Sequence, residues 1–346
     1  MNKLVNADRS NVKVTFFQRR HRIGHDFSLE SIFADIRCRL AKKIDSDVKI
    51  SKFHNNGPLT KIYNIFEAAL RQSGNINHIT GELHFLDLFM KKETVILTVL
   101  DCGMVAKKKG IARYLVKWLY LKLPVRSAKI VTAISEATKQ EILEYTKCEP
   151  SKISVIPVAV ELIYQPFPKA FNSTRPDILQ VGTPYNKNIG RLIESLRGLD
   201  CRLTIVGKLS SEHVDALNSN KIDYRNFYNL AADEMLERYR ECDILAFVST
   251  FEGFGMPIVE ANSVERVVIT SNISSMPEVA GDAACLVDPY DVNDIRNGIL
   301  RLINDEAYRN ELIDNGRKNK LRFDPEKISN SYLDLYRRLD HELARK

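Results

Sequence analysis

The stretch from Asp243 to Asn262, DILAFVSTFEGFGMPIVEAN, indicates the fold more clearly than any other part of the chain. It begins with an apolar run of the kind found in buried strands. Gly253 and Gly255 then permit a tight turn, and Pro257 suits the first position of a helix because its missing N–H would be unpaired there. The stretch therefore predicts a strand, a glycine-rich turn and a helix whose positive N-terminal end can bind an anion.

Two carboxylates flank this predicted anion site. Glu252 lies in the turn, and Glu260 lies one turn into the helix, so both can accept hydrogen bonds from hydroxyl groups. Backbone amides that bind an anion beside carboxylates that bind hydroxyls suit a phosphorylated sugar. The alternative is a tight turn with solvated glutamates, and the combination of features argues against it.

Short apolar runs rich in β-branched residues alternate with helical patterns along the rest of the chain, which predicts parallel sheets built from βαβ units. The clearest helix is 28–44, where apolar residues repeat at helical spacing. The predicted strands are 12–17, 48–53, 76–80, 94–100, 129–134, 153–157, 177–183, 202–207, 244–249 and 267–271. We therefore predict an α/β protein with two doubly wound, Rossmann-like domains facing a central cleft.

A segment rich in proline and polar residues, 160–176, interrupts this alternation and is typical of a linker. We place the domain boundary there, with an N-terminal domain over 1–168 and a C-terminal domain over 169–325. Residues 326–346 form a charged helix with an apolar stripe, which we expect to pack back towards the N-terminal domain.

The composition favours a cytoplasmic protein with reduced thiols. No stretch reaches the roughly 18 uninterrupted apolar residues of a membrane span, and residues 1–10 lack the apolar core of a signal peptide. The six cysteines are scattered singly, without the spacing of a zinc site. We therefore expect reduced, mostly buried thiols and no metal site.

The net charge of +7 is unevenly distributed along the chain. Residues 1–168 contain 27 Lys and Arg against 16 Asp and Glu, whereas residues 169–346 contain 24 against 28. A first half with a charge of +11 favours an anionic partner. No nucleic-acid recognition motif is found, and the basic excess lies on the half without the predicted anion site, so we do not expect nucleic-acid binding.

Two further motifs follow predicted strands. Lys187 in VGTPYNKN, 181–188, could reach a diphosphate as a point charge, although a lysine in such a place is more often a surface residue. In SSMPEV, 274–279, Ser275 and Glu278 have the spacing of a capping box. We interpret this motif as structural; the alternative is a second helix N-terminus directed at the cleft.

The motifs STFEGFGMPIVEAN, VGTPYNKN, IVGK and SSMPEVAGDAACLVDP resemble the donor-binding domain of family 4 glycosyltransferases, which have the GT-B fold. The resemblance covers most of residues 130–325 and extends more weakly to IGHDFSLESIF and NHITGELHF, which are similar to a bacterial subgroup that makes surface polysaccharides such as lipopolysaccharide. It implies that a hexose or deoxyhexose is transferred with retention from a nucleotide-diphosphate sugar to a glycan or lipid-linked acceptor, without a metal or other cofactor.

The resemblance also implies residue roles. Lys187 would stabilise the leaving diphosphate, Glu252 would contact the hexose hydroxyls, and Glu260 would bind the ribose hydroxyls. We name Lys187 and Glu252 as the catalytic pair. The other donor-binding candidates are Gly182, Thr183, Lys208, Tyr228, Asn229, Leu230, Gly253, Phe254, Gly255 and Met256, with the 228–230 loop lining the base.

One departure from the family concerns Leu100, which stands where relatives have a histidine that contacts the donor sugar near C6. The donor then lacks a C6 hydroxyl, another group substitutes, or activity is weakened. His78 and His84 are candidate substitutes, although a lone histidine is more often structural. The predicted acceptor side comprises Gly24, His78, His84 and Asp101.

Residues 107–129, KKKGIARYLVKWLYLKLPVRSAK, contain eight basic residues, no acidic ones and the single tryptophan, Trp118. Such a helix can lie in a headgroup layer, or it can be an ordinary amphipathic helix with a solvated basic face. The acceptor class that the resemblance implies favours peripheral association with the cytoplasmic face of the inner membrane. Arg19, Arg20 and Arg22, ahead of Gly24, could instead bind an acceptor phosphate.

Two rival functions stay open. A nucleotide-sugar epimerase shares the architecture but needs no acceptor surface, and the basic, aromatic segment argues against it. A partner subunit that binds nucleotide sugars with little or no turnover is suggested by Leu100, and the intact pair of glutamates argues against it.

Overall fold

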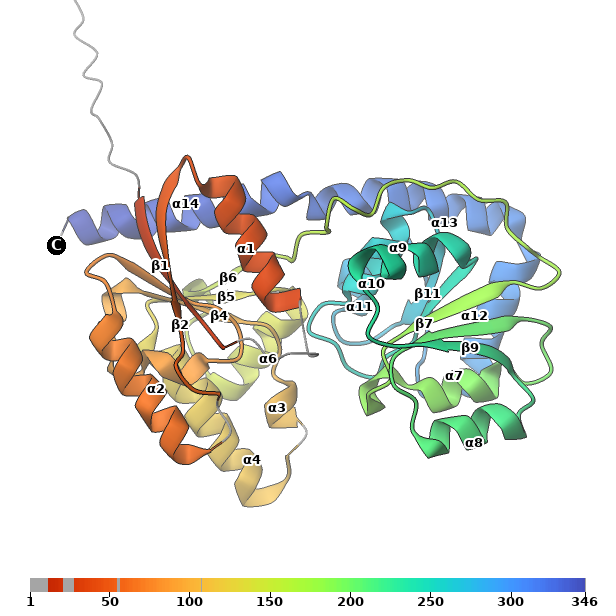
Figure 1. Ribbon diagram of the computed structural model, residues 1–346, viewed down its shortest axis with the longest axis horizontal. Coiled ribbons are helices and arrows are strands. Elements are labelled where there is room, and N and C mark those ends of the chain that lie inside the picture. The colour runs from red at the N-terminus through yellow and green to blue at the C-terminus, as the bar shows by residue number, and fades with distance from the viewer. Residues whose placement is uncertain (1–11, 21–27, 55–56, 107, 346) are drawn as a thin grey trace, which may run out of the picture.

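The computed structural model describes residues 12–20, 28–54, 57–106 and 108–345, which form two lobes side by side (Figure 1). Each lobe is built on a six-stranded sheet in which all recorded strand pairs are parallel. The predicted architecture of two doubly wound α/β units is therefore confirmed.

The sheet of the first lobe has the strand order β2-β1-β3-β4-β5-β6. The elements of this lobe are β1 (Val12–Gln18), α1 (Ser28–Leu40), β2 (Ile44–Ile50), α2 (Pro58–Arg71), β3 (Ile76–Ile79), η1 (His84–Phe89), η2 (Lys92–Thr94), β4 (Val95–Val99), α3 (Gly103–Ala106), α4 (Gly110–Lys117), η3 (Trp118–Lys122), α5 (Leu123–Ser127), β5 (Ile130–Ala133), α6 (Glu136–Thr146), η4 (Pro150–Lys152) and β6 (Ile153–Val155). The central strands are buried on both faces, as expected for apolar, β-branched runs in a parallel sheet.

The sheet of the second lobe has the order β12-β11-β10-β7-β8-β9. Its elements are β7 (Asp177–Val181), η5 (Tyr185–Lys187), α7 (Ile189–Ser195), β8 (Arg202–Val206), α8 (Ser211–Ser219), β9 (Asp223–Phe227), α9 (Ala232–Glu241), β10 (Ile244–Phe247), α10 (Met256–Ser263), β11 (Val267–Ser271), α11 (Met276–Ala280), β12 (Cys285–Val287), α12 (Val292–Asn304), α13 (Glu306–Asn319) and η6 (Lys320–Phe323). Helices α9, α10 and α11 pack on one face, and α7, α8 and α12 pack on the other.

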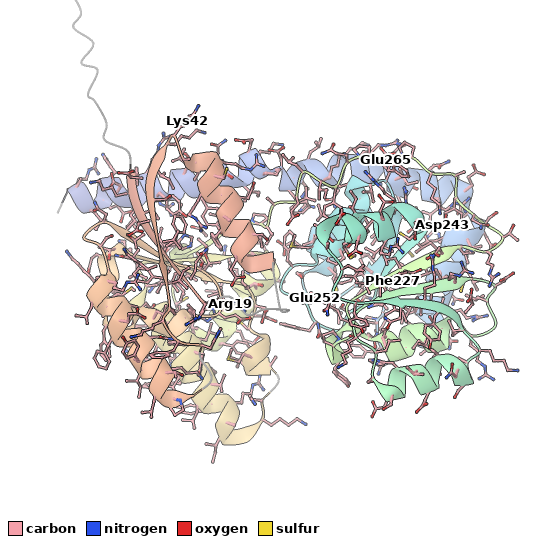
Figure 2. All side chains as sticks on the ribbon, viewed as in Figure 1. Arg19, Lys42, Phe227, Asp243, Glu252 and Glu265 are labelled. Carbon is pink, nitrogen blue, oxygen red and sulfur yellow. The ribbon has the colours of Figure 1, made fainter. Side chains whose placement is uncertain are left out.

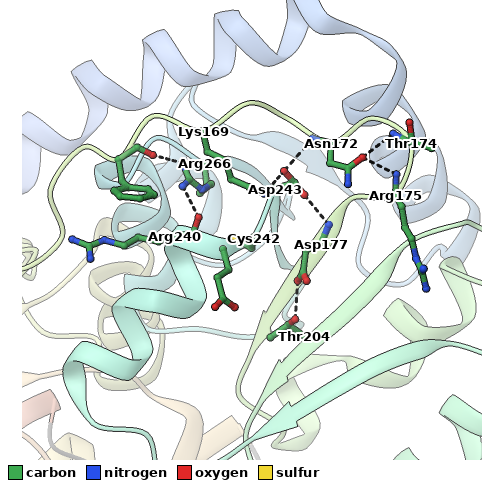
Figure 3. A network of polar contacts seen from close by, with 12 residues as sticks. Lys169, Asn172, Thr174, Arg175, Asp177, Thr204, Arg240, Cys242, Asp243 and Arg266 are labelled. Atoms are coloured by element: carbon green, nitrogen blue, oxygen red, sulfur yellow. Dashed lines mark hydrogen bonds and ion pairs between the residues drawn. The ribbon is translucent and has the colours of Figure 1, made fainter.

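The linker between the lobes is fixed to the second sheet by Asp243, which directly precedes β10 (Figure 3). The Asp243 carboxylate pairs with the Lys169 ammonium and accepts hydrogen bonds from the backbone N–H groups of Asn172 at 3.2 Å and Asp177 at 2.9 Å. A buried carboxylate is stable when it has such partners. The linker is therefore held at the edge of the sheet opposite the carboxyl ends of the strands.

The last helix, α14 (Pro325–Ala344), leaves the second lobe and lies along the first (Figure 1). It packs against α1, β1 and β3, and its apolar stripe includes Tyr332, Tyr336 and Leu339, all buried. The core of the first lobe is thus completed by residues that follow the second lobe in the sequence.

Several local predictions differ from the structure. The predicted strand 48–53 corresponds to β2, which runs from Ile44 to Ile50. The predicted helix 28–44 ends at Leu40, and Ile44 instead begins β2. The strands β9 and β12 were not predicted, because β9 is polar and largely accessible and β12 has only three residues. Residues 110–127 are helical throughout, but a π-turn at Trp118–Lys122 divides them, and Pro124 lies just after that turn.

Candidate active site

A cavity of about 400 Å³ lies between the lobes and is lined from both sides. The first lobe contributes His84, Leu100 and Asp101, and the second contributes Glu252 and Gly253. Figure 2 shows Glu252 on the side of the second lobe that faces the first. The glycine-rich turn and part of the predicted acceptor side therefore meet in one cleft.

The glycine-rich turn contacts the first lobe at Gly253. A Cβ atom at this position would lie 2.3 Å from the Leu100 carbonyl oxygen, so only glycine allows the approach. The Gly253 carbonyl oxygen accepts hydrogen bonds from the hydroxyls of Ser135 at 2.8 Å and Thr138 at 3.2 Å. The start of α6 therefore holds the turn against the first lobe.

The same turn is held from within the second lobe. The Ser275 hydroxyl is 3.0 Å from the Glu252 carbonyl oxygen and 2.7 Å from that of Phe254, a buried residue. Gly255 has a φ of +111°, which lets the chain turn into α10 at Met256. The N-terminal end of α10, the positive end of its helix dipole, follows directly after this turn.

Lys187 and Glu252 form an ion pair in the cleft. The Lys187 Nζ is 2.7 Å from Glu252 Oε1, and only 18% and 14% of the two side chains are exposed. The ammonium also lies 4.4 Å from the centre of the Phe247 ring. A Cβ at Gly182, whose φ is +87°, would lie 2.9 Å from Lys187 Cε, so this glycine makes room for the lysine chain.

Lys187 is the last residue of η5, so it lies before the helix α7 and not within it. Asn188 has a φ of +58° and directly precedes α7, which begins at Ile189. The Asn188 side chain donates hydrogen bonds to the carbonyl oxygens of Val248 at 3.0 Å and Pro289 at 2.7 Å, so the turn is fixed from two sides.

Glu260 lies deeper, on α10, and its carboxylate accepts a hydrogen bond from the Tyr239 phenol of α9. Burial raises the pKa of Glu260 to about 7, and the hydrogen bond from Tyr239 opposes that shift. The Tyr239 ring is fully buried and meets the ring of Tyr164 edge to face at 5.4 Å. The hydrogen bond therefore fixes the position of the Glu260 carboxylate. Its pKa lies close to neutral pH.

The remaining donor-side candidates lie at the carboxyl ends of β7, β8 and β9. The Thr183 hydroxyl donates to the Lys208 carbonyl oxygen at 2.8 Å, and the Lys208 side chain is exposed. Tyr228 is 61% exposed, and Asn229 has a φ of +56° in the turn before Leu230. These residues surround the edge where open α/β sheets bind ligands.

Two acceptor-side candidates line the cleft. The His84 Nδ1–H donates to the Tyr120 carbonyl oxygen at 2.9 Å, and burial lowers the pKa of this histidine. Asp101 is exposed and accepts a hydrogen bond from the Gly103 N–H at 2.7 Å. Gly24 lies outside the described residues.

The assignment of His78 to the acceptor side is wrong. His78 is fully buried under α14, with Nδ1 2.8 Å from the Tyr336 hydroxyl and Nε2 2.7 Å from the Thr98 hydroxyl. Burial and the charge of Arg37 lower its pKa to about 3, so it is a neutral core residue.

Ser275 and Glu278 have structural contacts, but the capping box that their spacing suggested does not form. Ser275 makes no side-chain cap on α11. Glu278 instead accepts hydrogen bonds from the N–H groups of Glu136 at 2.8 Å and Ala137 at 3.1 Å, the first residues of α6 in the other lobe. The Glu278 carboxylate lies at the positive end of α6. Its hydrogen bonds to α6 connect the two lobes.

Several site residues were not found from the sequence. Asn186 donates to the Phe251 carbonyl oxygen at 3.0 Å and to Glu252 Oε1 at 3.3 Å, and it lines the cleft. Asn186 directly precedes Lys187 in the sequence, and this position could have indicated that it belongs to the site. Tyr239, 21 residues before its partner Glu260, has no such signal.

A family model described as glycosyl transferases group 1 matches residues 164–319, the part of the chain that contains Lys187, Glu252 and Glu260. These residues form a group 1 glycosyltransferase domain. The match confirms the family that the motifs of this domain predicted.

Curated relatives of the chain include two mannosyltransferases of Escherichia coli. The serotype-specific mannosyltransferase WbdA is 28% identical over 212 residues, which cover 54% of this chain and 26% of WbdA. The O-antigen chain mannosyltransferase B is 27% identical over 252 residues, which cover 67% of this chain and 66% of that protein. The chain thus spans about a quarter of the first relative.

The structure of sucrose-phosphate synthase from Thermosynechococcus elongatus resembles both lobes together. It superposes with a TM-score of 0.77 at 18% identity, over 95% of this chain and 99% of that one. The group 1 domain and the first lobe therefore have the GT-B fold that was predicted. Among the described residues, no helix is long and apolar enough to cross a membrane, and no group of His, Cys, Asp and Glu could hold a metal ion.

Proposed function

We propose that the chain is a retaining glycosyltransferase that moves a sugar from a nucleotide-diphosphate donor to a glycan or lipid-linked acceptor during surface-polysaccharide assembly. The observation that carries this proposal is the pairing of Lys187 with Glu252 beside the start of α10, in a cleft whose opposite wall contains Asp101 and His84. The similarity to mannosyltransferases makes nucleotide-diphosphate mannose the first donor to test.

In this proposal the second lobe stabilises the charge that develops on the leaving diphosphate. Lys187 is held in place by its ion pair with Glu252, and the start of α10 adds the positive end of a helix dipole, so neither needs to reorganise as the bond breaks. The acceptor hydroxyl attacks the anomeric carbon from the face that the nucleotide diphosphate leaves, and its proton passes to the departing phosphate oxygen. The reaction needs no carboxylate nucleophile and, in our proposal, no metal or other cofactor.

The two glutamates have different partners in this proposal. Glu252 accepts hydrogen bonds from hydroxyl groups of the donor sugar while it stays paired with Lys187. Glu260 accepts hydrogen bonds from the ribose hydroxyls. The 228–230 loop lies against the base. Leu100 leaves the sugar's C6 end facing an apolar side chain, so the donor panel includes deoxyhexoses.

The test measures nucleotide release from a panel of nucleotide-diphosphate sugars, with and without a chelator. We expect one donor to be hydrolysed slowly in both conditions. Lys187→Ala should lower that rate by about 10²- to 10³-fold, as loss of one charge-stabilising group does elsewhere. Lys42→Ala, an exposed lysine in the turn after α1 (Figure 2), is the control and should leave the rate unchanged.

Equal rates in the Lys187→Ala variant and the native protein would contradict the site assignment. Binding of donors without any release of nucleotide would contradict the proposed turnover.

We also propose that the chain works at the cytoplasmic face of a membrane, bound through the surface of residues 108–129. Ile111 is 80% exposed, Tyr114 65% and Trp118 42%, and the segment has no acidic residue. Apolar and aromatic side chains among Lys and Arg suit an anionic headgroup layer.

A further inference from the structure

Three cavities of the first lobe adjoin one another and differ in chemistry. The interlobe cleft shares Glu82, Met104 and Tyr120 with a second cavity of about 170 Å³. That cavity shares Lys61, Phe85 and Tyr120 with a third, of about 350 Å³. The three cavities therefore lie next to one another, from the candidate active site to the outer surface of α2 and η3.

The middle cavity is basic. Arg19 forms ion pairs with Glu30 at 2.6 Å and Glu82 at 2.7 Å, so its charge is largely balanced. Arg20 donates to the Lys52 carbonyl oxygen at 3.0 Å, and Lys61 donates to the Tyr120 hydroxyl. Within the described part of the chain, neither Arg20 nor Lys61 forms an ion pair with a carboxylate.

These two cations lie beside one another in a concave site whose only acidic lining residue, among those described, is Glu82, already paired with Arg19. Arginine and lysine in such a place bind phosphate oxygens by charge-assisted hydrogen bonds. The middle cavity therefore suits a phosphate or diphosphate group.

The third cavity is an apolar groove between α2 and η3, lined by Ile65, Phe85, Leu88 and Leu119. Its neighbourhood is apolar well beyond the groove. The exposed side chains on α2 and α4 include Leu59 at 80%, Ile62 at 50%, Phe66 at 53%, Leu70 at 87%, Ile111 at 80% and Leu115 at 51%. Exposed apolar side chains in such number on these two helices are typical of an interaction site.

We propose that these cavities together hold a lipid phosphate that carries the acceptor sugar. The sugar enters the cleft, the phosphate or diphosphate binds Arg20 and Lys61, and the lipid chain lies in the groove beside Leu119. The order polar, cationic, apolar across the three cavities matches the order sugar, phosphate, chain along such a molecule. Binding to a bare membrane surface would not require a concave cationic site next to the active-site cleft. The role of the sugar rests on the proposed function.

The test measures the affinity of decyl phosphate by titration calorimetry, below its micelle-forming concentration. Inorganic phosphate and decanol, which each lack one half of the probe, should bind at least about tenfold more weakly. The double variant Arg20→Ala with Lys61→Met should weaken decyl phosphate binding by at least about tenfold. Leu119→Ser should weaken it as well.

Two control variants match these changes in kind. Lys42→Ala removes an exposed cation elsewhere on the same lobe, and Leu286→Ser removes an apolar side chain that is 41% exposed on the other lobe, against 43% for Leu119. Both should bind decyl phosphate like the native protein. Thermal unfolding of every variant checks that the fold is kept.

Equal affinity in the native protein and the double variant would overturn the proposal, and so would equal affinity for decyl phosphate and decanol. The outcome is separable from the proposed function, because donor hydrolysis without acceptor depends on the second lobe. If the chain binds decyl phosphate through Arg20 and Lys61 but releases no nucleotide, the lipid-phosphate site is supported and the proposed transferase function is contradicted.

Discussion

The two glutamates of the candidate donor site are held by different partners. Glu252 is paired with the Lys187 ammonium, whereas Glu260 faces the Tyr239 phenol and lies where burial raises its pKa to about 7. Glu252 therefore has a cation held beside it, whereas the pKa of Glu260 lies close to neutral pH, so Glu260 changes charge within the working range.

The raised pKa of Glu260 predicts a pH-dependent stability. Between its ordinary value of 4.5 and about 7, the folded chain retains a proton that the unfolded chain has released, so the free energy of unfolding falls as the pH rises through this window. Glu260→Gln removes this effect. The melting temperature of the variant relative to the native protein should rise from pH 4.5 to 7 and then stay constant; a flat difference throughout would show that the pKa is not raised.

The Tyr239 hydroxyl predicts a second pH effect, on donor binding. Its hydrogen bond lowers the pKa of Glu260, so Tyr239→Phe should raise that pKa further. If the ionised carboxylate accepts the ribose hydroxyls, the pH at which donor affinity is half-maximal should move upwards in the variant. Tyr164→Phe, which alters the neighbouring ring that meets Tyr239 edge to face, is the control and should move it less. Affinity that does not depend on pH in either protein would exclude Glu260 from donor binding.

At the residue scale, the sequence predicted the cluster of Lys187 and Glu252 but not the partners of Glu260. The glycines, Pro257 and Glu260 lie within a few residues of one another, so the sequence is enough to predict the turn and the start of α10. Tyr239 and His78 depend on packing between distant segments, and their burial cannot be read from neighbouring residues. His78 for that reason was predicted for the cleft and lies in the core.

At the scale of elements, the contact between the glycine-rich turn and the end of β4 determines how the lobes meet. The φ of Gly253 is not in the left-handed region, so the need for glycine there comes from space alone.

Gly253→Ala should therefore act on the lobe arrangement. The new Cβ would lie 2.3 Å from the Leu100 carbonyl oxygen, so the lobes must separate or the turn must move. We expect loss of donor turnover and a larger radius of gyration by small-angle scattering. Gly190→Ala, where a Cβ would meet nothing within 4 Å, is the control. Unchanged turnover in Gly253→Ala would show that this contact is not needed.

Glu278 should stabilise α6 from the other lobe. Removing its carboxylate leaves the N–H groups of Glu136 and Ala137 without their acceptor, so Glu278→Ala should lower the free energy of unfolding by about 1 kcal/mol. Glu278→Gln keeps one acceptor oxygen and should lose less. The measurement is urea unfolding, together with hydrogen exchange of the first α6 amides, which should become faster only if the cap acts as described.

The elements themselves were predictable where their pattern is strong and local. The buried central strands of both sheets match the apolar runs, whereas β9 is an edge strand with polar residues and gives no such signal. The helix 28–44 was extended too far because Ile44 fits the helical repeat as well as it fits β2.

At the scale of the whole molecule, the exposed apolar side chains of α4 and η3 predict membrane binding. The chain should sediment with vesicles that contain phosphatidylglycerol and not with vesicles of phosphatidylcholine alone, and salt should weaken the binding because the basic residues contribute. Ile111→Ser with Leu115→Ser should reduce the bound fraction, and Leu286→Ser on the other lobe should not. Equal sedimentation of all three proteins with both vesicles would contradict this surface.

The architecture of two facing α/β lobes followed from the alternation of strands and helices and from the linker composition. The adjoining cavities from the cleft to the apolar groove did not, because they are lined by Arg20, Lys61 and Leu119 from three separate segments. The packing of α2 and of the π-turn against η1 brings Lys61 and Leu119 together, and Arg20 comes from the segment after β1.

The position of α14 has a consequence for how the chain acquires its structure. Val14, Phe33 and Ile36 are covered by Tyr332 and Tyr336, which are separated from them by the entire second lobe. While the chain is being synthesised, this side of the first lobe stays uncovered until residues 325–344 have left the ribosome. The lobe that is made first is therefore finished last, after the second lobe has had time to fold.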